Sequence, residues 1–224
     1  MSSLAGRATH NAIAAFEFYA NYHGHTIAHL STLLPLLRFA QPDAAIVWLI
    51  GDSSLDNKYW LGGAQGNAVN GYEYALDPPR CAKDVAYWMN VVASKSSQKR
   101  RYVVINAAVE ESTLSDRQSK LLPHDEFVRD NLQKDDVVVC SVGGNDIALR
   151  PSGGTVCSMI GLNFFTSQSS IDSGNVSGCS MRHLQGLFRD AVSTYLARVT
   201  EKTAPRLVLP CMIYFPCQVR TALL

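Results

Sequence analysis

The chain has 224 residues, of which 47% are hydrophobic and 17% are charged, and its formal net charge is +1. That length is sufficient to bury a core, so we expect a single domain over residues 1–224. The near balance of 20 Lys and Arg against 19 Asp and Glu lacks the basic excess of a nucleic-acid-binding protein. The longest apolar runs fall far short of the roughly 18 to 20 residues that a membrane-spanning helix needs. The sequence therefore predicts neither a transmembrane segment nor a nucleic-acid partner.

The N-terminal stretch 1–21 carries Arg7 and His10 with no apolar run behind them. A secretory signal has an apolar region of about 7 to 15 residues followed by a small-residue cleavage site. Since both features are missing here, we expect a cytoplasmic location.

Four short apolar runs have the length of strands. They are continuous instead of alternating and are rich in Val and Ile, which is typical of parallel strands buried on both faces. The runs are 44–50, 102–106, 136–142 and 206–215.

Segments with helical periodicity alternate with these runs. The first covers 27–40 and contains Pro35, where we expect a kink. The second is predicted to begin at 77–79, where an Asp precedes two prolines as a cap precedes a first turn. Two more helices are predicted over 125–133 and 181–200.

This alternation predicts an α/β fold with three layers and a mostly parallel sheet of the flavodoxin-like kind. The stretches 61–76 and 151–180 are rich in Gly, Asn and Ser, and we expect both to be irregular. The second has about the length of a functional lid or a partly disordered loop. In such folds ligands bind at the carboxyl ends of the strands, so the functional residues should follow the strands.

Two polar motifs stand where strands are predicted to end. Gly51-Asp52-Ser53 follows the first strand, and Gly143-Gly144-Asn145-Asp146 follows the third. A serine on such a turn exposes its hydroxyl, and its own N–H can meet a developing negative charge. An amide such as that of Asn145 can donate to the same oxyanion. Both motifs are also ordinary turn sequences, in which Asp and Asn bond their own backbone.

These two motifs resemble blocks of the SGNH hydrolases, also called GDSL-type esterases and lipases. The resemblance implies that Ser53 is the nucleophile and that the Asn145 side chain donates to the oxyanion. The family's second block supplies a backbone N–H from a glycine after a strand that ends in Asn. By position Ala108 takes the place of that glycine, although the segment also fits a strand followed by an ordinary turn.

The family's fourth block, Asp-x-x-His, has no match in the chain. The resemblance therefore indicates a domain truncated at its C-terminus, and a serine without a base to take its proton reacts very slowly. His124 and His183 are the two histidines that stand where a helix is predicted to start, and either is an alternative base.

Two further patterns have more than one interpretation. His23, His25 and His29 have a spacing that can serve a metal, but they also fit a helix start. Four aromatic residues around the loop after Ser53 can line a pocket or simply pack, and they are Tyr59, Trp60, Tyr72 and Tyr74.

The sequence thus predicts a serine esterase with the catalytic residues Ser53, Ala108 and Asn145, and with no cofactor or metal. Its partner would be a small-molecule ester, with an acyl lipid or an acetylated sugar as examples that the resemblance suggests. Two alternatives stay open. One is an inactive relative that only binds ligand, and the other is a flavodoxin-like domain that binds an anion on the Ser53-Ser54 turn.

Overall fold

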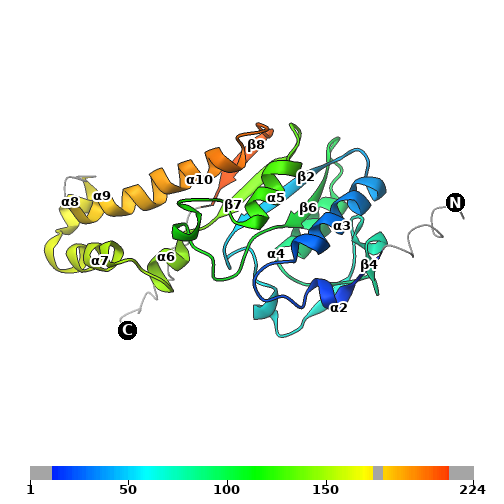
Figure 1. Cartoon of the computed structure of the whole chain (residues 1–224), viewed down its shortest axis with the longest axis horizontal. Coiled ribbons are helices and arrows are strands. Elements are labelled where there is room, and N and C mark those ends of the chain that lie inside the picture. Colours follow the sequence, from blue (N-terminus) through cyan, green and yellow to red (C-terminus); the bar gives the residue numbers. More distant parts are fainter. Residues whose placement is uncertain (1–11, 174–178, 212–224) are drawn as a thin grey trace, which may run out of the picture.

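The computed structural model describes residues 12–173 and 179–211, and Figure 1 shows their arrangement. The main sheet has four parallel strands in the order β6–β2–β7–β8. These strands are β2 (Ala44–Gly51), β6 (Arg101–Asn106), β7 (Val137–Ser141) and β8 (Leu207–Pro210). The predicted α/β class and mostly parallel sheet are confirmed. Residues 212–215 of the last predicted strand lie outside the described residues.

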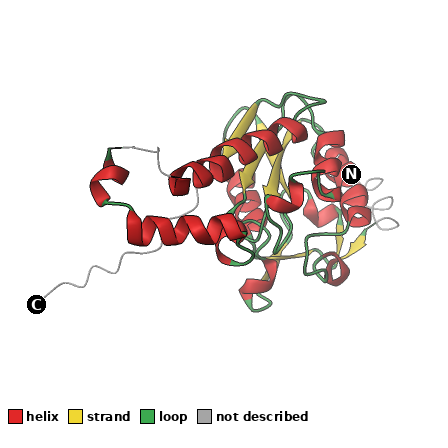
Figure 2. Ribbon diagram, turned by 60° about the vertical axis from the view of Figure 1, so that its left-hand side comes forward, coloured by secondary structure: helices red, strands yellow, loops and turns green. Residues whose placement is uncertain are grey.

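Helices cover both faces of the sheet, as Figure 2 shows. Ile46, Trp48 and Ile50 of β2 share one buried cluster with residues of four α-helices. Val47 and Leu49 point to the opposite face and share a second cluster with residues of one other helix. The helices of the first cluster are α2 (Ala15–Phe18), α3 (Ile27–Ala40), α5 (Pro123–Asn131) and α10 (Val192–Val199), and the helix of the second is α4 (Val85–Lys95). The apolar character of β2 on both faces thus follows from burial on both sides.

The structure confirms the predicted helix over 27–40. The third predicted helix, over 125–133, begins and ends two residues earlier in the structure. The fourth, over 181–200, is a continuous helical segment of α9 (Cys179–Gln185), a π-helical turn (Gly186–Ala191) and α10. The predicted start of the second helix at 77–79 is wrong. The chain there forms β4 (Leu76–Asp77) and β5 (Arg80–Ala82), and Asp84 is the cap of α4, where its Oδ1 accepts the Tyr87 N–H at 2.8 Å.

The stretch 151–180 is not irregular throughout, in contrast to the prediction. It contains α7 (Gly153–Phe165) and α8 (Gln168–Asp172), and the Ser152 side chain caps α7 by accepting the Thr155 N–H at 3.1 Å. Its many Gly and Ser residues concealed this pattern. In Figure 1, α7, α8 and α9 form an arm that projects from the sheet.

The remaining short elements lie outside the main sheet. The strands β1 (Ile13–Ala14) and β4 pair in parallel, and β3 (Gln65–Asn67) and β5 pair antiparallel. The helix α2 (Ala15–Phe18) follows β1, and α6 (Gly144–Ala148) follows β7. None of the helices in the described residues is both long and apolar enough to cross a membrane.

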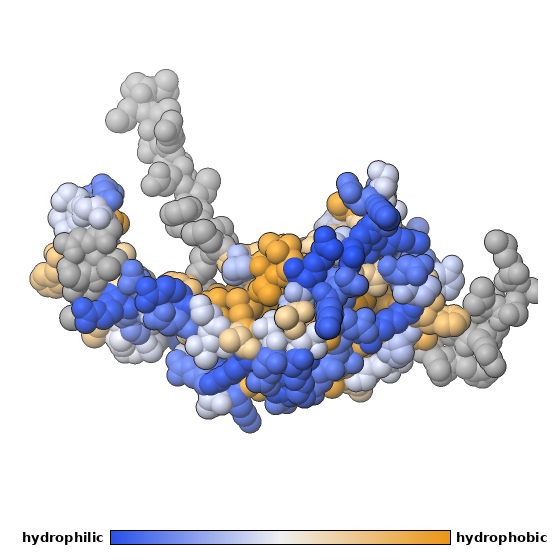
Figure 3. Space-filling model, turned by 90° about the horizontal axis from the view of Figure 1, so that it is seen from above, coloured by the Kyte–Doolittle hydropathy of each residue, from blue (hydrophilic) through white to orange (hydrophobic). Residues whose placement is uncertain are grey.

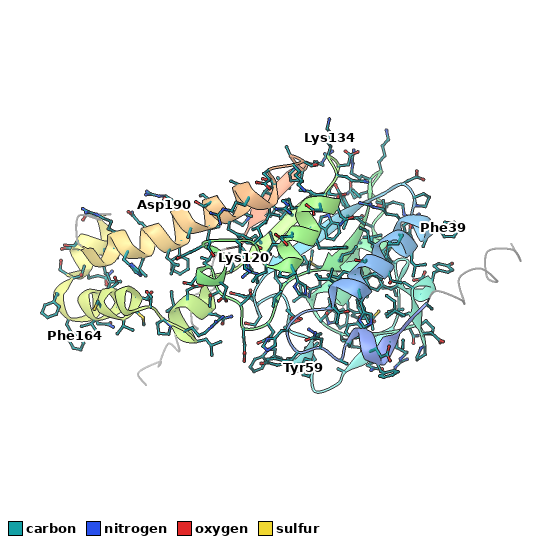
Figure 4. All side chains as sticks on the ribbon, in the orientation of Figure 1. Phe39, Tyr59, Lys120, Lys134, Phe164 and Asp190 are labelled. Atoms are coloured by element: carbon teal, nitrogen blue, oxygen red, sulfur yellow. The ribbon has the colours of Figure 1, made fainter. Side chains whose placement is uncertain are left out.

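The strand order has a switch point between β2 and β7. From β2 the chain passes to β6 on one side, and it then returns to β7 on the other side. Ligands of open α/β sheets bind in the crevice at the carboxyl ends of the two strands that flank such a point. Figure 4 shows Tyr59, which follows β2, and Lys134, which precedes β7, at opposite edges of the molecule.

Candidate active site

The turn after β2 is held against the end of β7. Gly51 has a φ of +126°, and a Cβ there would lie 1.8 Å from the Ser141 carbonyl oxygen, so a side chain at this position cannot be accommodated. The buried Asp52 carboxylate accepts the Ser54 N–H at 3.0 Å, the Ser54 hydroxyl at 2.7 Å and the Gly143 N–H at 3.1 Å. Asp52 therefore joins the two predicted motifs.

Ser53 is half-buried on this turn. Neither its Oγ nor its N–H forms a hydrogen bond with any residue that the structure describes. The Asp52 N–H, just before it, donates to the Ser141 carbonyl at 2.9 Å, and the carbonyl of Asp52 accepts from Leu55 and Asp56 at 3.0 Å each. A hydrogen-bonded turn thus presents a serine whose hydroxyl and N–H have no partner within the described part of the chain.

Asn145 in α6 reaches the same edge of the sheet. Its Nδ2 donates to the Ser112 carbonyl at 3.0 Å, which uses one amide hydrogen, and the other has no acceptor among the residues that the structure describes. The Ser112 Oγ lies 2.7 Å from the Val109 carbonyl oxygen and 3.1 Å from the Gly51 carbonyl oxygen, so its one hydrogen is shared between these two acceptors. The structure therefore brings the elements carrying Ser53 and Asn145 together through Ser112. Their catalytic roles stay predictions.

Ala108 does not fit its predicted role. Its N–H donates to the Asn106 Oδ1 at 3.0 Å, and the residue is buried at 1% exposure, so this N–H is not available to an oxyanion. Three residues later, Glu111 has a left-handed φ of 62°, and its N–H has no acceptor among the described residues. Glu111 precedes Ser112 directly, so this N–H belongs to the same loop as the Ser112 carbonyl that the Asn145 amide binds.

Two residues near the candidate site, Glu111 and Arg117, could not be recognised from the sequence as part of it. Glu111 occupies a backbone conformation that favours glycine, and a glycine there would have marked the second block at once. Arg117 is 1% exposed and donates to the Gly51 carbonyl and to the Ser112 hydroxyl at 3.0 Å each. Its buried partner is Asp125, at 2.9 Å. Arg117 therefore links the end of β2 to Ser112 through its hydrogen bonds. It does so from a buried position, although arginine is usually exposed.

Neither alternative base contacts Ser53. The His124 Nε2 lies 2.6 Å from the His25 carbonyl oxygen, and burial lowers the pKa of His124. The His183 Nε2 lies 3.1 Å from the Thr155 hydroxyl on α7. Across residues 12–173 and 179–211, no histidine forms a hydrogen bond with Ser53.

The three histidines near the N-terminus do not converge on a metal. The His23 Nδ1 lies 3.1 Å from the Glu110 carbonyl, whereas the His25 Nδ1 lies 2.7 Å from the Phe18 carbonyl. Burial lowers the pKa of His25 to about 3, so this ring is neutral at pH 7. The described part of the chain contains no group of three His, Cys, Asp or Glu side chains arranged to hold a metal.

The four aromatic residues after Ser53 divide into two kinds. Tyr72 is buried, and its hydroxyl donates to the Val104 carbonyl at 2.8 Å, so it packs in the core. Tyr59, Trp60 and Tyr74 are exposed by 48%, 71% and 54%. Trp60 donates its indole N–H to the Glu110 carboxylate at 3.2 Å. Glu110 in turn lines a pocket of about 470 Å³ that also includes Ser112.

Comparisons of the chain with protein-family models, with curated proteins and with solved structures found no match. The similarity to SGNH hydrolases therefore depends on the two motifs and on their positions beside the switch point. The same geometry weighs against an anion cradle on the Ser53-Ser54 turn, because the Ser54 N–H already donates to the Asp52 carboxylate at 3.0 Å and is not available to a bound anion.

Proposed function

We propose that the chain carries the nucleophile and the oxyanion-binding groups of an SGNH-type serine esterase acting on carboxylic esters. One observation carries the proposal: three donors at the carboxyl edge of the sheet lack an acceptor among the described residues. They are the Ser53 N–H, the Glu111 N–H and the second amide hydrogen of Asn145. Donors fixed around a candidate nucleophile stabilise the negative charge of a tetrahedral intermediate.

In the proposed reaction the Ser53 Oγ attacks the acyl carbon of the ester. The Oγ–H proton passes to a general base, and the electron pair of the carbonyl moves onto its oxygen, which the three donors hold. Collapse of this intermediate expels the alcohol with a proton and leaves an acyl-serine. Water then attacks the acyl group, releases the acid and restores Ser53.

The base is the part of the mechanism that the geometry does not supply. The SGNH resemblance predicts a histidine as the base. The His124 ring, however, forms a hydrogen bond with the His25 carbonyl, and the His183 ring forms one with the Thr155 hydroxyl. The rival function, a protein that binds esters without hydrolysing them, has the same pocket and no working base. Turnover and nucleophile reactivity must therefore be measured separately.

A fluorophosphonate probe tests the nucleophile. We expect the probe to label the protein and the Ser54→Ala variant, whereas Ser53→Ala should not be labelled. Ser54 is the matched control because it is the next residue and its hydroxyl is already bonded to Asp52 and Ser141. Equal labelling of Ser53→Ala and the parent protein contradicts the assignment of Ser53.

Hydrolysis of p-nitrophenyl acetate tests the whole site. Asn145→Ala should lower kcat by about 10²- to 10³-fold, the usual effect of removing one oxyanion donor. If Ser53→Ala abolishes turnover while His124→Ala and His183→Ala retain it, neither histidine is the base. A chain that binds esters but shows neither labelling nor turnover supports the binding protein instead.

A further inference from the structure

The main sheet has two edge strands, β6 and β8. An edge strand leaves a row of N–H and C=O groups unpaired, and such a row can bind another strand. In β6 these groups are covered from within the chain. The Asn90 side chain accepts the Val104 N–H and donates to the Val104 carbonyl, both at 2.9 Å. The Asn70 side chain donates to the Tyr102 carbonyl at 2.9 Å, so the β6 edge is closed to a further strand.

The outer edge of β8 has no such cover in the described part of the chain. The Arg206 N–H donates to the Asp136 carbonyl, on the side of β7, at 2.9 Å. Because N–H groups point alternately to the two sides of a strand, those of Leu207 and Leu209 point away from β7. Among the residues that the structure describes, neither leucine forms a backbone hydrogen bond on that outer side. Leu207 and Leu209 therefore carry the open N–H and C=O groups of the edge.

The side chains of β8 extend the apolar second face of the sheet. In the strand register, Leu207 lies beside Val137 and Leu209 lies beside Val139. Val137 belongs to the second buried cluster and Val139 packs against it, whereas the two leucines are exposed by 47% and 44%. β8 lies at the top of Figure 1, and Figure 3, seen from above, shows apolar surface between the arm and a strongly hydrophilic region. Since parallel sheets are usually covered on both faces, the exposed leucines indicate an edge that a further strand would complete.

The open edge is short and carries no charge. Charged side chains within an edge strand usually prevent pairing with another chain, but residues 207–210 include none. The edge is bounded by Pro205 and Pro210, which have no N–H to offer. Beyond Pro210, the Cys211 N–H is already used, since it donates to the Cys140 carbonyl of β7 at 2.7 Å. A partner strand must therefore match the two open residues between the prolines.

This short edge is complementary to itself. A two-fold axis between two copies sets their β8 strands antiparallel. With the axis at Val208, Leu207 of one copy lies opposite Leu209 of the other, and each of these pairs closes both of its N–H···O=C bonds. An axis at Leu207 would set Leu209 opposite Pro205, which has no N–H. An axis at Leu209 would set Leu207 opposite Cys211, whose N–H is bonded to β7.

We propose that a second copy of this chain pairs with the open edge of β8, in an antiparallel two-fold arrangement centred on Val208. The two main sheets then form one continuous sheet. Opposite residues of an antiparallel pair point to the same face, so Leu207 of each copy packs against Leu209 of the other. An uncharged edge offers no complement to a charged peptide, whereas its register fits the strand itself. The pairing uses no group of the candidate active site, so it is independent of the proposed esterase function.

Sedimentation velocity of the full chain over about a hundredfold range of concentration tests the pairing. We expect a monomer–dimer equilibrium that Leu207→Pro weakens about tenfold, because proline removes an outward N–H from each copy and leaves the bonds to β7 intact. The matched control Leu207→Val keeps the N–H and a residue that favours strands, so it should dimerise as the parent does. A parent that stays monomeric throughout overturns the proposal, as does a Leu207→Pro protein that dimerises as tightly as the parent.

Crosslinking tests the register. At the axis Val208 faces its own copy in a non-hydrogen-bonded pair, with Cα atoms about 4.5 Å apart, which suits a disulfide. Val208→Cys should therefore give a covalent dimer on mild oxidation, above the background of the parent with its exposed Cys157 and Cys211. Leu209→Cys should not, because its two copies lie about 7 to 8 Å apart on the diagonal. Equal crosslinking of the two variants overturns the proposal, and if Leu207→Pro unfolds in a urea titration, this comparison decides alone.

Discussion

A buried ion pair beneath the candidate site should have a large effect on stability. Arg117 and Asp125 lie 2.9 Å apart with side-chain exposures of 1% and 0%. Asp125 also accepts the Tyr195 hydroxyl at 2.6 Å and the Leu122 N–H at 3.1 Å. The nearly isosteric substitution Asp125→Asn removes the negative charge without opening a cavity, so it leaves the guanidinium buried and uncompensated.

We expect this substitution to lower the free energy of unfolding by about 3 to 5 kcal/mol, which is typical when one partner of a buried pair is lost. The chain offers a matched exposed pair, since Arg100 and Asp135 lie 2.6 Å apart with exposures of 37% and 71%. Solvent screens that pair, so Asp135→Asn should cost less than about 1 kcal/mol.

Urea unfolding at pH 7, followed by circular dichroism, measures both effects. With a slope of about 2 kcal/mol per molar urea, Asp125→Asn should shift the midpoint by about 2 M, and Asp135→Asn by less than about 0.5 M. Equal shifts for the two variants would refute the reasoning, because burial is the property in which the two pairs differ.

Two further predictions concern the backbone at Glu111 and the cap of α4. Glu111→Gly should be more stable than Glu111→Ala by about 1 kcal/mol, since only the alanine retains the strain of the φ of 62°; equal urea midpoints contradict this. Burial raises the pKa of Asp84 to about 6, so its stabilising contribution is present below about pH 4 and is lost as the pH rises through 6. Asp84→Asn keeps a capping oxygen and should gain about 3 kcal/mol over the parent at pH 8 but little at pH 4. A gain that is the same at both values would show that titration is not its cause.

The strands were predictable because their signal is local. Residues 44–50 are continuously apolar, and the structure buries this run on both faces as part of β2. The helix over 153–165 was not predictable in the same way. It contains no charged residue and three glycines, so it has no polar face to set its periodicity. Its cap at Ser152 was the available signal.

The residues of the candidate site also divide into those that the sequence could predict and those that it could not. Ser53 and Asn145 follow strands directly, so their motifs and positions could be read from the sequence. Glu111 matters for its left-handed backbone conformation, and Arg117 matters for the contacts it makes from a buried position. Neither property can be predicted from the residue type. Ala108 was predicted from its position after the end of the strand. Its N–H, however, already donates to the Asn106 side chain.

The geometry also changes how the two motifs should be interpreted. Turn-making and function were opposing explanations of each motif in the sequence, but the structure assigns the turn-making to separate residues. Asp52 accepts three hydrogen bonds that fix its turn to Gly143, and Asp146 accepts the N–H groups of Leu114 and Ser115 at 2.7 and 3.0 Å. These carboxylates satisfy backbone groups of the two turns, whereas the Ser53 hydroxyl has no hydrogen-bond partner among residues 12–173 and 179–211. Turn-making therefore accounts for the two aspartates of the motifs, and the roles of Ser53 and Asn145 are left to the labelling and turnover experiments.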